Sequence, residues 1–207
     1  MTDLKWNYLI RSDLYRITGN IRLRTLLYHL LFGEAYRYNF WLRTGYFLRN
    51  RPLLKYTAYP LVWLILRRLS FQLGISIPAG TRIGSGLYIG HFGGIVVSGR
   101  SVIGKNCNLS HGVTLGQANR GPNKGYPTLG DNVYLGPGAK VVGAVHIGSN
   151  VAIGANCVVT KDVPDHAVVV GVPGRVISYK GSAGYVNRTD YDECLNPARQ
   201  IACQQKD

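Results

Sequence analysis

The sequence repeats with a period of six residues between Ile83 and Gly154. In each repeat an aliphatic residue is followed by a small one, which is usually glycine. The repeats are Ile83-Gly84, Ile89-Gly90, Ile103-Gly104, Leu109-Ser110, Leu115-Gly116, Leu129-Gly130, Leu135-Gly136, Val141-Val142, Ile147-Gly148 and Ile153-Gly154. This period is typical of a parallel β-helix, in which three hexapeptides build one triangular coil and coils stack at roughly 4.8 Å. One coil cannot bury its own core, so the leading aliphatic residues must form a continuous apolar column.

A second set of small apolar residues is expected to fill the rest of this core. They lie at or beside the fifth position of a hexad: Val113, Val133, Val145, Val151 and Cys157. Cys107 is equivalent to Cys157, and we expect both to be core thiols. The four cysteines contain no CxxC pair and no spacing typical of metal ligands, which favours a reducing compartment and no metal site.

The chain divides into three parts. Its 207 residues suffice for one solenoid with a small flanking domain. We expect a basic, aromatic-rich helical segment at 1–72, the β-helix at 73–178 and a polar tail at 179–207. The tail is predicted either to strap a neighbouring subunit or to be mobile.

The first segment carries most of the charge imbalance. The formal net charge is +14, and residues 1–70 hold 12 Lys and Arg against 3 Asp and Glu, with 14 of the 22 aromatic residues. Leucines recur at helical spacing between Leu23 and Leu31. Gly33, Gly45 and Pro52 are the expected helix breaks. We predict that these helices cap the open end of the β-helix, which would otherwise expose backbone edges.

The helical segment at 1–72 also gives an expectation for the cellular compartment. Its longest apolar run, from Tyr59 to Leu66, is well short of the roughly 20 residues that a membrane span needs. No secretory signal is recognisable at the start of the chain, and no nucleic-acid-binding motif is present. We therefore expect a cytoplasmic protein. A basic, aromatic, amphipathic segment can also rest on an anionic membrane surface, so peripheral contact with the inner face of the cytoplasmic membrane is compatible with the cap.

The six-residue count first fails between Ile89 and Val97, which are eight residues apart. Three glycines surround His91 in this interval. Glycine permits left-handed backbone and leaves amide N–H groups accessible. His91 follows the inward-facing Ile89 by two positions, so its ring should point out of the prism, where an imidazole can act as a general base. A histidine packed at the surface or against another subunit is the alternative.

The count fails again between Leu115 and Leu129. Residues 117–127 hold no hexad and consist mainly of polar and turn residues. Loops that project from a rigid solenoid commonly line a binding groove, although a solvated turn is the alternative. The candidates for binding a substrate, such as the acceptor of a transferred group, are therefore Asn119, Arg120 and Tyr126.

Segments around these interruptions resemble the bacterial serine acetyltransferases. The similar segments are Ile77-Pro78-Ala79, Ile83 to Leu87, His91, Gly94 to Val97 and Val113 to Gly116. Further on, Thr160 to Pro164 and Gly171 to Ile177 resemble the closing signature of the wider hexapeptide acyltransferase superfamily. The resemblance covers roughly residues 74–178.

This resemblance implies a mainly β fold, a left-handed parallel β-helix with a short N-terminal helical segment. That hand departs from the usual right-handed crossover. It also implies a homotrimer with active sites between adjacent subunits, acetyl-CoA as donor, no metal, and His91 as the catalytic base. By the same resemblance the backbone of Gly116, Pro137 and Ala155 lines the pantetheine channel, and Lys161 and Arg175 bind the CoA phosphates.

We expect direct transfer, with the amides of Gly93 and Gly94 holding the oxyanion. The family's aspartate partner of the catalytic histidine is missing here, so a backbone carbonyl or Ser76 is expected to orient the ring.

Two further departures concern the acceptor. Serine acetyltransferases have an acidic residue where this chain has Gly90, and a second loop histidine where it has Tyr126. Both losses weaken recognition of a small amino acid. We therefore predict O-acetylation of a bacterial surface polysaccharide (capsule, exopolysaccharide or lipopolysaccharide) or its precursor. The sequence does not fix the sugar, its hydroxyl, or whether trimers pair.

Four alternatives remain at this stage. The first is serine O-acetyltransferase of cysteine biosynthesis. The second is a metal enzyme of the γ-carbonic anhydrase type, disfavoured because His91, His111 and His146 are expected to lie too far apart. The third is a non-catalytic trimeric membrane-associated scaffold. The fourth keeps the enzyme but takes His111 as the base, placed three coils, or about 14 Å, beyond His91.

Overall fold

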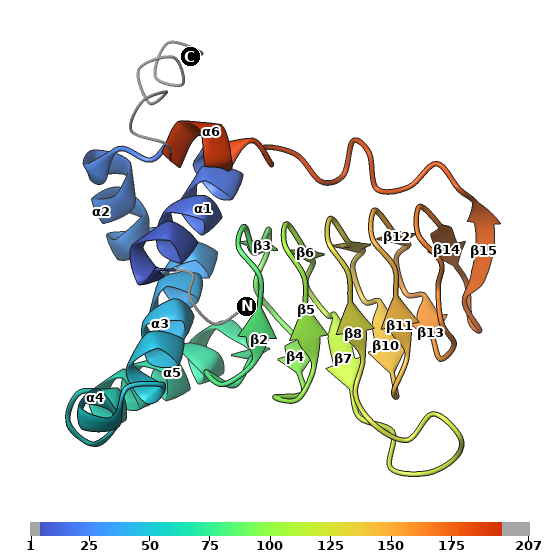
Figure 1. Ribbon diagram of the computed structural model, residues 1–207, viewed down its shortest axis with the longest axis horizontal. Helices are drawn as coiled ribbons and strands as arrows, with labels where there is room; N and C mark the ends of the chain where they lie inside the picture. Colours follow the sequence, from blue (N-terminus) through green and yellow to red (C-terminus); the bar gives the residue numbers. More distant parts are fainter. Residues whose placement is uncertain (1–4, 196–207) are drawn as a thin grey trace.

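The structure is a computed structural model that describes residues 5–195 of the chain. These residues form a triangular stack of short strands with a group of helices at one end (Figure 1). The strands pair in parallel, apart from the last one, which is antiparallel to its neighbour.

Three sheets form the sides of the prism. The first contains β1 (Ile75–Ser76), β4 (Ile95–Val97), β7 (Thr114–Gly116), β10 (Lys140–Val142) and β13 (Val158–Val159). The second contains β2 (Arg82–Ile83), β5 (Val102–Ile103), β8 (Thr128–Leu129) and β11 (His146–Ile147). The third contains β3 (Tyr88–Ile89), β6 (Asn108–Leu109), β9 (Tyr134–Leu135), β12 (Ala152–Ile153), β14 (Val168–Val170) and β15 (Arg175–Ser178).

The register confirms the predicted apolar columns. Ile89 pairs with Leu109, and Leu109 pairs with Leu135. These three side chains are at most 2 % exposed. The second set of core residues is buried as well: Val113, Val133, Val145, Val151, Cys107 and Cys157. Burying each large aliphatic side chain contributes about 1.5–3 kcal/mol, so the six-residue pattern supplies the main driving force for stacking.

One edge of the prism carries a ladder that the sequence analysis did not anticipate. Asn106, Asn132 and Asn150 occupy equivalent corners with φ between 56° and 57°, a left-handed conformation that asparagine tolerates better than most residues. The Asn106 amide donates to Asn132 at 2.9 Å, and the Asn132 amide donates to Asn150 at 3.0 Å. The side chains therefore bond along the stack while their backbones turn the corner.

In the described part of the chain, five helices precede the strands. They are α1 (Trp6–Thr18), α2 (Leu23–Leu31), α3 (Glu34–Arg49), α4 (Pro52–Thr57) and α5 (Tyr59–Leu73). Tyr38, Leu42 and Leu66 from these helices belong to the same apolar core as Ile75 and the columns of the prism. The helices thus close the first end of the β-helix, as predicted.

The helix break expected at Gly45 is wrong, because α3 runs through it. A side chain at this position would bring a Cβ within 3.1 Å of both Ala79 Cβ and Leu66 Cδ1. Glycine is therefore needed here for close packing of α3 against α5 and the first turn of the prism. Gly33 lies between α2 and α3, and Pro52 is the first residue of α4, so a helix break occurs at or next to both.

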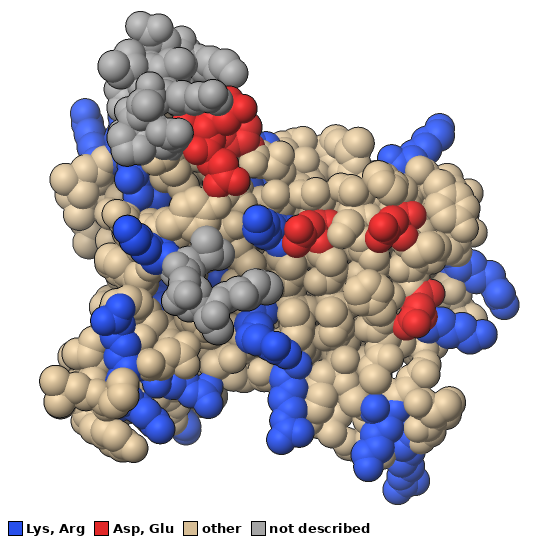
Figure 2. Space-filling model, viewed as in Figure 1, with Lys and Arg blue, Asp and Glu red and all other residues tan. Residues whose placement is uncertain are grey.

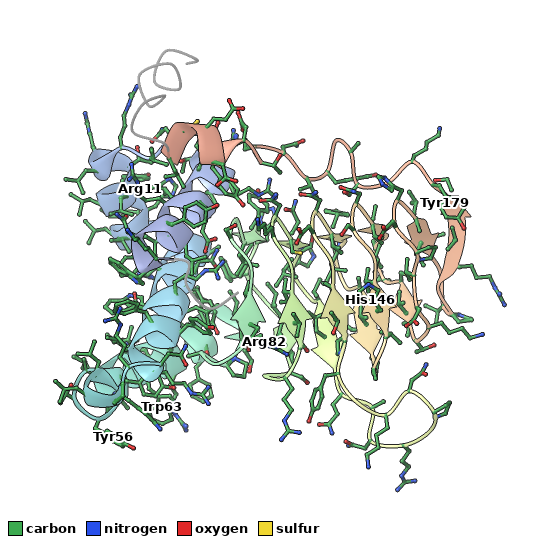
Figure 3. All side chains as sticks on the ribbon, viewed as in Figure 1. Arg11, Tyr56, Trp63, Arg82, His146 and Tyr179 are labelled. Atoms are coloured by element: carbon green, nitrogen blue, oxygen red, sulfur yellow. The ribbon has the colours of Figure 1, made fainter. Side chains whose placement is uncertain are left out.

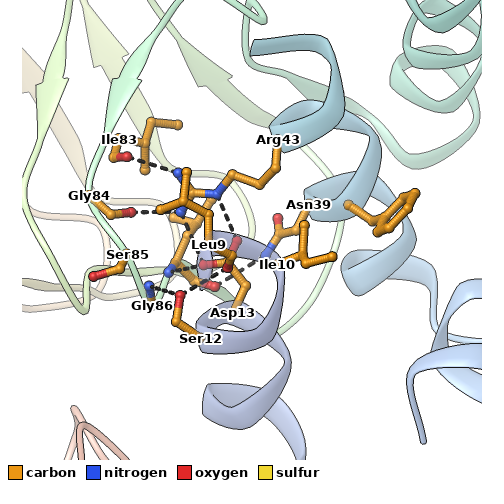
Figure 4. A network of polar contacts seen from close by, with 12 residues as sticks. Leu9, Ile10, Ser12, Asp13, Asn39, Arg43, Ile83, Gly84, Ser85 and Gly86 are labelled. Atoms are coloured by element: carbon orange, nitrogen blue, oxygen red, sulfur yellow. Dashed lines mark hydrogen bonds and ion pairs between the residues drawn. The ribbon is translucent and has the colours of Figure 1, made fainter. Parts of the chain in front are cut away.

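A buried ion pair joins the helices to the chain that leads to β3 (Figure 4). The Arg43 guanidinium donates to both carboxylate oxygens of Asp13, at 2.9 and 3.0 Å. It also donates to the carbonyls of Ile83 and Gly84 at 2.8 and 2.6 Å, while Asp13 accepts the backbone N–H of Leu87 at 2.8 Å. Burial raises the pKa of the Asp13 carboxyl, and Arg43 opposes that rise.

Two neutral hydrogen bonds extend the same junction. The backbone N–H of Gly86 donates to the Ser12 hydroxyl at 3.1 Å, and the Asn39 amide donates to the carbonyl of Leu87 at 3.1 Å. Backbone groups of the turn between β2 and β3 are therefore bonded by side chains from α1 and α3. The position of β3 relative to the helices is fixed by directional bonds as well as by apolar packing.

The segment after β15 does not fit either sequence expectation. It runs back along its own prism and ends in α6 (Tyr191–Leu195), which packs on α1 (Figure 1). The Ser182 hydroxyl donates to the carbonyl of Asn132 at 2.6 Å, and Tyr185 stacks on Tyr134 with ring centroids 4.5 Å apart. Residues 179–195 thus strap their own chain, and the rest of the predicted tail lies outside the described residues.

Charge is distributed unevenly over the surface. Figure 2 shows Lys and Arg across the helical end, whereas Asp190, Asp192 and Glu193 lie together at α6. Within residues 5–195, no helix has the length and apolar character needed to cross a bilayer.

The ion pair gives a direct stability prediction. Replacing Arg43 with methionine leaves Asp13 buried without its partner and removes the donors to Ile83 and Gly84. Breaking one side of a buried pair costs about 3–5 kcal/mol. We expect a loss of this size in urea unfolding, whereas Arg24→Met, at an exposed position of α2, should change the unfolding free energy by less than about 0.5 kcal/mol. Equal effects of the two substitutions would contradict the assigned role.

Candidate active site

His91 lies at the corner where the chain passes from β3 in the third sheet to β4 in the first. We call this corner, in all coils, the histidine edge. Five residues separate the buried Ile89 and Ile95 here, whereas three separate Leu109 and Val113 in the next coil. The two additional residues let the corner bulge outward, and the His91 side chain is exposed, as the sequence predicted.

The predicted position of His111 is wrong. Because β3 pairs directly with β6, His111 lies one coil from His91 rather than three. The two rings meet edge to face with centroids 6.2 Å apart. Three hexads make one coil, so the three hexads between Ile89 and Leu109 amount to a single coil. The structure thus brings together two imidazoles that the sequence analysis kept apart.

The histidine edge continues along the stack through two predicted cofactor residues. The backbone N–H of Gly138 donates to the carbonyl of His111 at 2.9 Å, and the N–H of Asn156 donates to the carbonyl of Pro137 at 2.8 Å. These bonds place Pro137 and then Ala155 on successive coils beyond His111. Arg175 pairs with Val170 at the end of β14, so it stands at the far end of the same edge.

The glycines after His91 have the backbone that the sequence analysis expected. Gly93 has φ of 107° and Gly94 has φ of 65°. The carbonyl of Gly93 accepts the N–H of Gly112 at 2.7 Å, which ties the bulge to the next coil. Within the described part of the chain, no protein group accepts a hydrogen bond from the N–H of Gly93 or Gly94. Both donors are therefore free to bind an oxygen atom.

The expected orienting group for His91 is not found. Ser76 lies on β1 and pairs with Val96, on the first sheet. Among residues 5–195, neither Ser76 nor a backbone carbonyl is hydrogen-bonded to the His91 ring. The described contact of this ring is with His111, and it fixes the relative orientation of the two imidazoles by edge-to-face packing.

The projecting loop leaves a different corner, where the first sheet passes to the second. We call this the loop edge. The loop protrudes from the prism as predicted (Figure 1), and Ala118 and Gly125 close its base by exchanging two hydrogen bonds of 3.0 Å. Asn119 and Arg120 are exposed in it. Tyr126 lies half-buried at its base, with the Arg100 guanidinium over its ring at 5.6 Å.

Two predicted cofactor residues share the loop edge. Gly116 ends β7 where the loop begins, and Lys161 is exposed at the turn after β13. The Asn123 amide of the loop donates to the carbonyl of Thr160 at 2.7 Å, so the loop folds toward Lys161 along the stack. The predicted site residues are therefore split between two edges of one prism.

A cavity of about 200 Å³ opens beside His91, on the side of the helices. One wall consists of Tyr88 to Phe92, and the other comes from the junction of α2 with α3. The second wall includes His29 and the carboxylate-bearing Glu34, neither of which the sequence analysis selected. No local motif could have found them, because they lie far from His91 in the sequence.

Neither of the free cysteines found within residues 5–195 can serve as a nucleophile near this cavity. Cys107 and Cys157 are buried in the prism core. Burial raises the pKa of the Cys107 thiol to about 12, which leaves almost no thiolate at neutral pH. This agrees with transfer that does not pass through an acyl-enzyme.

No group of three or more His, Cys, Asp and Glu side chains within residues 5–195 is arranged to hold a metal ion. A zinc enzyme was disfavoured because His91, His111 and His146 were expected to lie too far apart. That expectation is wrong for His91 and His111, which are adjacent. His146, however, is on β11 of the second sheet, on a different side of the prism (Figure 3).

The family model of the bacterial transferase hexapeptide, which spans six repeats, matches residues 126–161. With the three-sheet prism and the outward histidine, this match defines a hexapeptide-repeat transferase and confirms the predicted left-handed parallel β-helix.

Sequence relatives place the chain more closely. A serine acetyltransferase of Staphylococcus aureus is 42 % identical over 171 residues, which cover 83 % of this chain and 72 % of that protein. One from Synechococcus elongatus is 45 % identical over 123 residues, 59 % of this chain and 50 % of the relative. This chain therefore spans only half the length of the Synechococcus relative. The match to the Staphylococcus protein shows that this chain belongs to the serine acetyltransferase family.

Solved structures of serine acetyltransferases are also similar to this chain. Serine acetyltransferase of Neisseria gonorrhoeae in complex with serine superposes with a TM-score of 0.69 at 30 % identity, covering 84 % of this chain and 69 % of that one. The Brucella abortus enzyme in complex with coenzyme A gives a TM-score of 0.70 at 28 % identity, covering 85 % and 69 %. The expectations of an acyltransferase and of a coenzyme A thioester donor are confirmed at the level of the family.

The predicted polysaccharide acceptor is corrected by these findings, because the relatives and the similar structures are serine acetyltransferases. The prediction treated the missing acid before His91 as the loss of an amino-acid site. That argument considered only neighbours in the sequence, whereas the fold places Glu34 in the lining of the same cavity.

Proposed function

We propose that this protein transfers the acetyl group of acetyl-CoA to the hydroxyl of L-serine. The observation that carries the proposal is an exposed histidine beside a small cavity, in a chain that is 42 % identical to a serine acetyltransferase over most of its length. A cavity of about 200 Å³ is below the roughly 300 Å³ at which drug-sized sites begin, which suits a small acceptor.

The proposed reaction is a direct transfer. The imidazole of His91 accepts the proton of the serine hydroxyl as the hydroxyl oxygen attacks the thioester carbonyl. A carbon–oxygen bond forms, the carbon–sulfur bond then breaks, and the leaving thiolate takes the proton from the imidazolium. The products are O-acetylserine and free coenzyme A. Holding both substrates at one edge supplies much of the acceleration.

The glycine bulge would stabilise the charge that develops on the carbonyl oxygen. The N–H groups of Gly93 and Gly94 have no acceptor among the described residues, and they adjoin His91 in the chain. Preorganised backbone donors act strongly because they need no reorganisation during the reaction. Lys161 and Arg175 remain the proposed partners of the coenzyme A phosphates.

Removing the base tests the mechanism. His91→Asn should lower kcat by about 10²- to 10⁴-fold, the usual contribution of a positioned general base. Release of free coenzyme A with L-serine as acceptor, followed with a thiol reagent, measures this. The control His146→Asn changes an exposed histidine on another side of the prism and should keep full activity.

Two outcomes would count against this assignment. Full activity of His91→Asn together with inactive His111→Asn would move the base to His111. No thiol release by the unaltered protein with L-serine would overturn the proposed function.

We also propose that the protein is a homotrimer with its sites between subunits. The histidine edge and the loop edge lie at opposite borders of the first sheet, so one prism presents them in different directions. If His91 and the loop residues Asn119, Arg120 and Tyr126 act on the same substrates, the loop must come from a neighbouring prism. A closed three-fold ring, which the resemblance to serine acetyltransferases implies, gives every copy both contacts.

A mixing experiment tests shared sites. His91→Asn and a variant lacking residues 119–124 should each be inactive as pure trimers. Co-expressed, they should regain part of the activity, because some sites then combine an intact histidine with an intact loop. Recovery should be absent if each chain carries a whole site, and a native mass of one 22.8 kDa chain would also contradict the proposal.

For location, we propose the cytoplasm, with peripheral contact between α4–α5 and an anionic membrane surface. Leu53, Tyr56 and Phe71 are 76–78 % exposed. Lys55 and Arg67 lie beside aromatic rings of the same helices, and Tyr56 and Trp63 are both labelled at this end of the molecule in Figure 3. Exposed apolar side chains among basic ones match the requirements of an anionic lipid surface. A second copy of this face would bring like charges together.

Sedimentation with vesicles tests this contact. We expect binding to vesicles that contain phosphatidylserine, weaker binding in high salt, and little binding to neutral phosphatidylcholine vesicles. The double variant Leu53→Ser with Phe71→Ser should lose binding while keeping acetyl transfer. Absence of binding to either vesicle, or pairing of trimers through this face, would overturn the proposal.

A further inference from the structure

The lining of the cavity beside His91 includes one acidic residue, Glu34. Between residues 5 and 130 the sequence has only two acidic residues, Asp13 and Glu34. Asp13 is buried and bonded to Arg43. Glu34 is exposed, lines the cavity, and has no ion pair among the described residues. Within residues 5–130, Glu34 is therefore the acidic residue without an ion-pair partner, and it shares the lining of this cavity with His91.

The position of Glu34 is held by its surroundings. It is the first residue of α3, and the preceding Gly33 forms a tight junction, since a Cβ there would come within 2.7 Å of the carbonyl oxygen of His29. Two residues further on, the buried Tyr36 hydroxyl donates to the carbonyl of Ile10 at 3.0 Å. The Asn39 amide then ties the same helix to Leu87, just before β3. Glu34 and His91 thus belong to two elements that are bonded to each other.

A purely structural role must be considered first. An acidic residue in the first turn of a helix interacts favourably with the helix dipole, and α3 has Glu34 there. That role does not account for its place in a cavity shared with the catalytic histidine. A carboxylate there would bind a cation on the acceptor, and the ammonium group of serine lies only a few bonds from the hydroxyl that must reach His91.

We propose that Glu34 binds the ammonium group of the acceptor, so that it selects an amino acid over an uncharged or anionic alcohol and turns the hydroxyl toward His91. This inference rests on the proposed function. It also explains how a chain with Gly90 beside its catalytic histidine recognises a small amino acid: the acid comes from the helical segment instead of from the histidine edge.

The test compares two acceptors that differ in the amine alone. L-serine and 3-hydroxypropionate both offer a primary hydroxyl and a carboxylate, but only serine carries an ammonium group. The unaltered protein should prefer serine, as measured by kcat/KM for thiol release. Glu34→Gln should reduce this preference by about tenfold or more, the usual worth of a hydrogen bond between charged groups. Its KM for acetyl-CoA should not change, and Glu34→Asp should restore part of the preference.

Glu193→Gln is the matched control, because it makes the same change in the first turn of another helix, away from the cavity. It should leave the preference unaltered. If Glu34→Gln lowers thermal stability but keeps the preference for serine, Glu34 acts only on its helix and the inference fails while the proposed function stands. If the unaltered protein transfers acetyl to neither acceptor, the proposed function and the inference fail together.

Discussion

The buried ion pair between Asp13 and Arg43 connects the two parts of this protein. A coil of the β-helix has its backbone hydrogen bonds directed along the stack, so its first turn would otherwise have unpaired carbonyls. Arg43 bonds two of them, at Ile83 and Gly84, and Asp13 keeps that guanidinium in place. The helices thereby lie against the strand that leads to His91, and the cavity beside the histidine exists only because they do.

The site itself depends on an irregularity of the repeat. A regular corner needs three residues between its inward-facing side chains, and the corner at His91 has five. The longer corner pushes the imidazole outward and leaves the amides of Gly93 and Gly94 without acceptors among residues 5–195. On later coils of the stack, the regular corners with Pro137 and Ala155 continue the same edge. A rigid stack with one altered corner therefore holds His91 exposed at one end of a regular edge.

The candidate site was predictable to the extent that its residues interrupt a pattern. The six-residue repeat is interrupted at His91, at the glycines after it and at the projecting loop. The sequence pattern alone was therefore enough to select them. His29 and Glu34 interrupt nothing, because they are ordinary residues at a helix junction, and their place in the cavity follows from how α3 packs. The polysaccharide acceptor was predicted wrongly for the same reason. The absence of an acid beside His91 in the sequence does not mean the absence of an acid beside it in space.

The sequence by itself determined the architecture, since a strict six-residue period can bury its aliphatic residues in only one way, as columns inside a triangular stack. It also determined which residues turn the corners and that His91 lies exposed at an irregular one. The tertiary structure decided what lies next to that base. Stacking placed His111 one coil away, α3 brought Glu34 to the cavity, and the strap of residues 179–195 returned to its own prism. Such contacts join segments distant in the sequence, so their geometry is set by packing and by buried hydrogen bonds that no local pattern records.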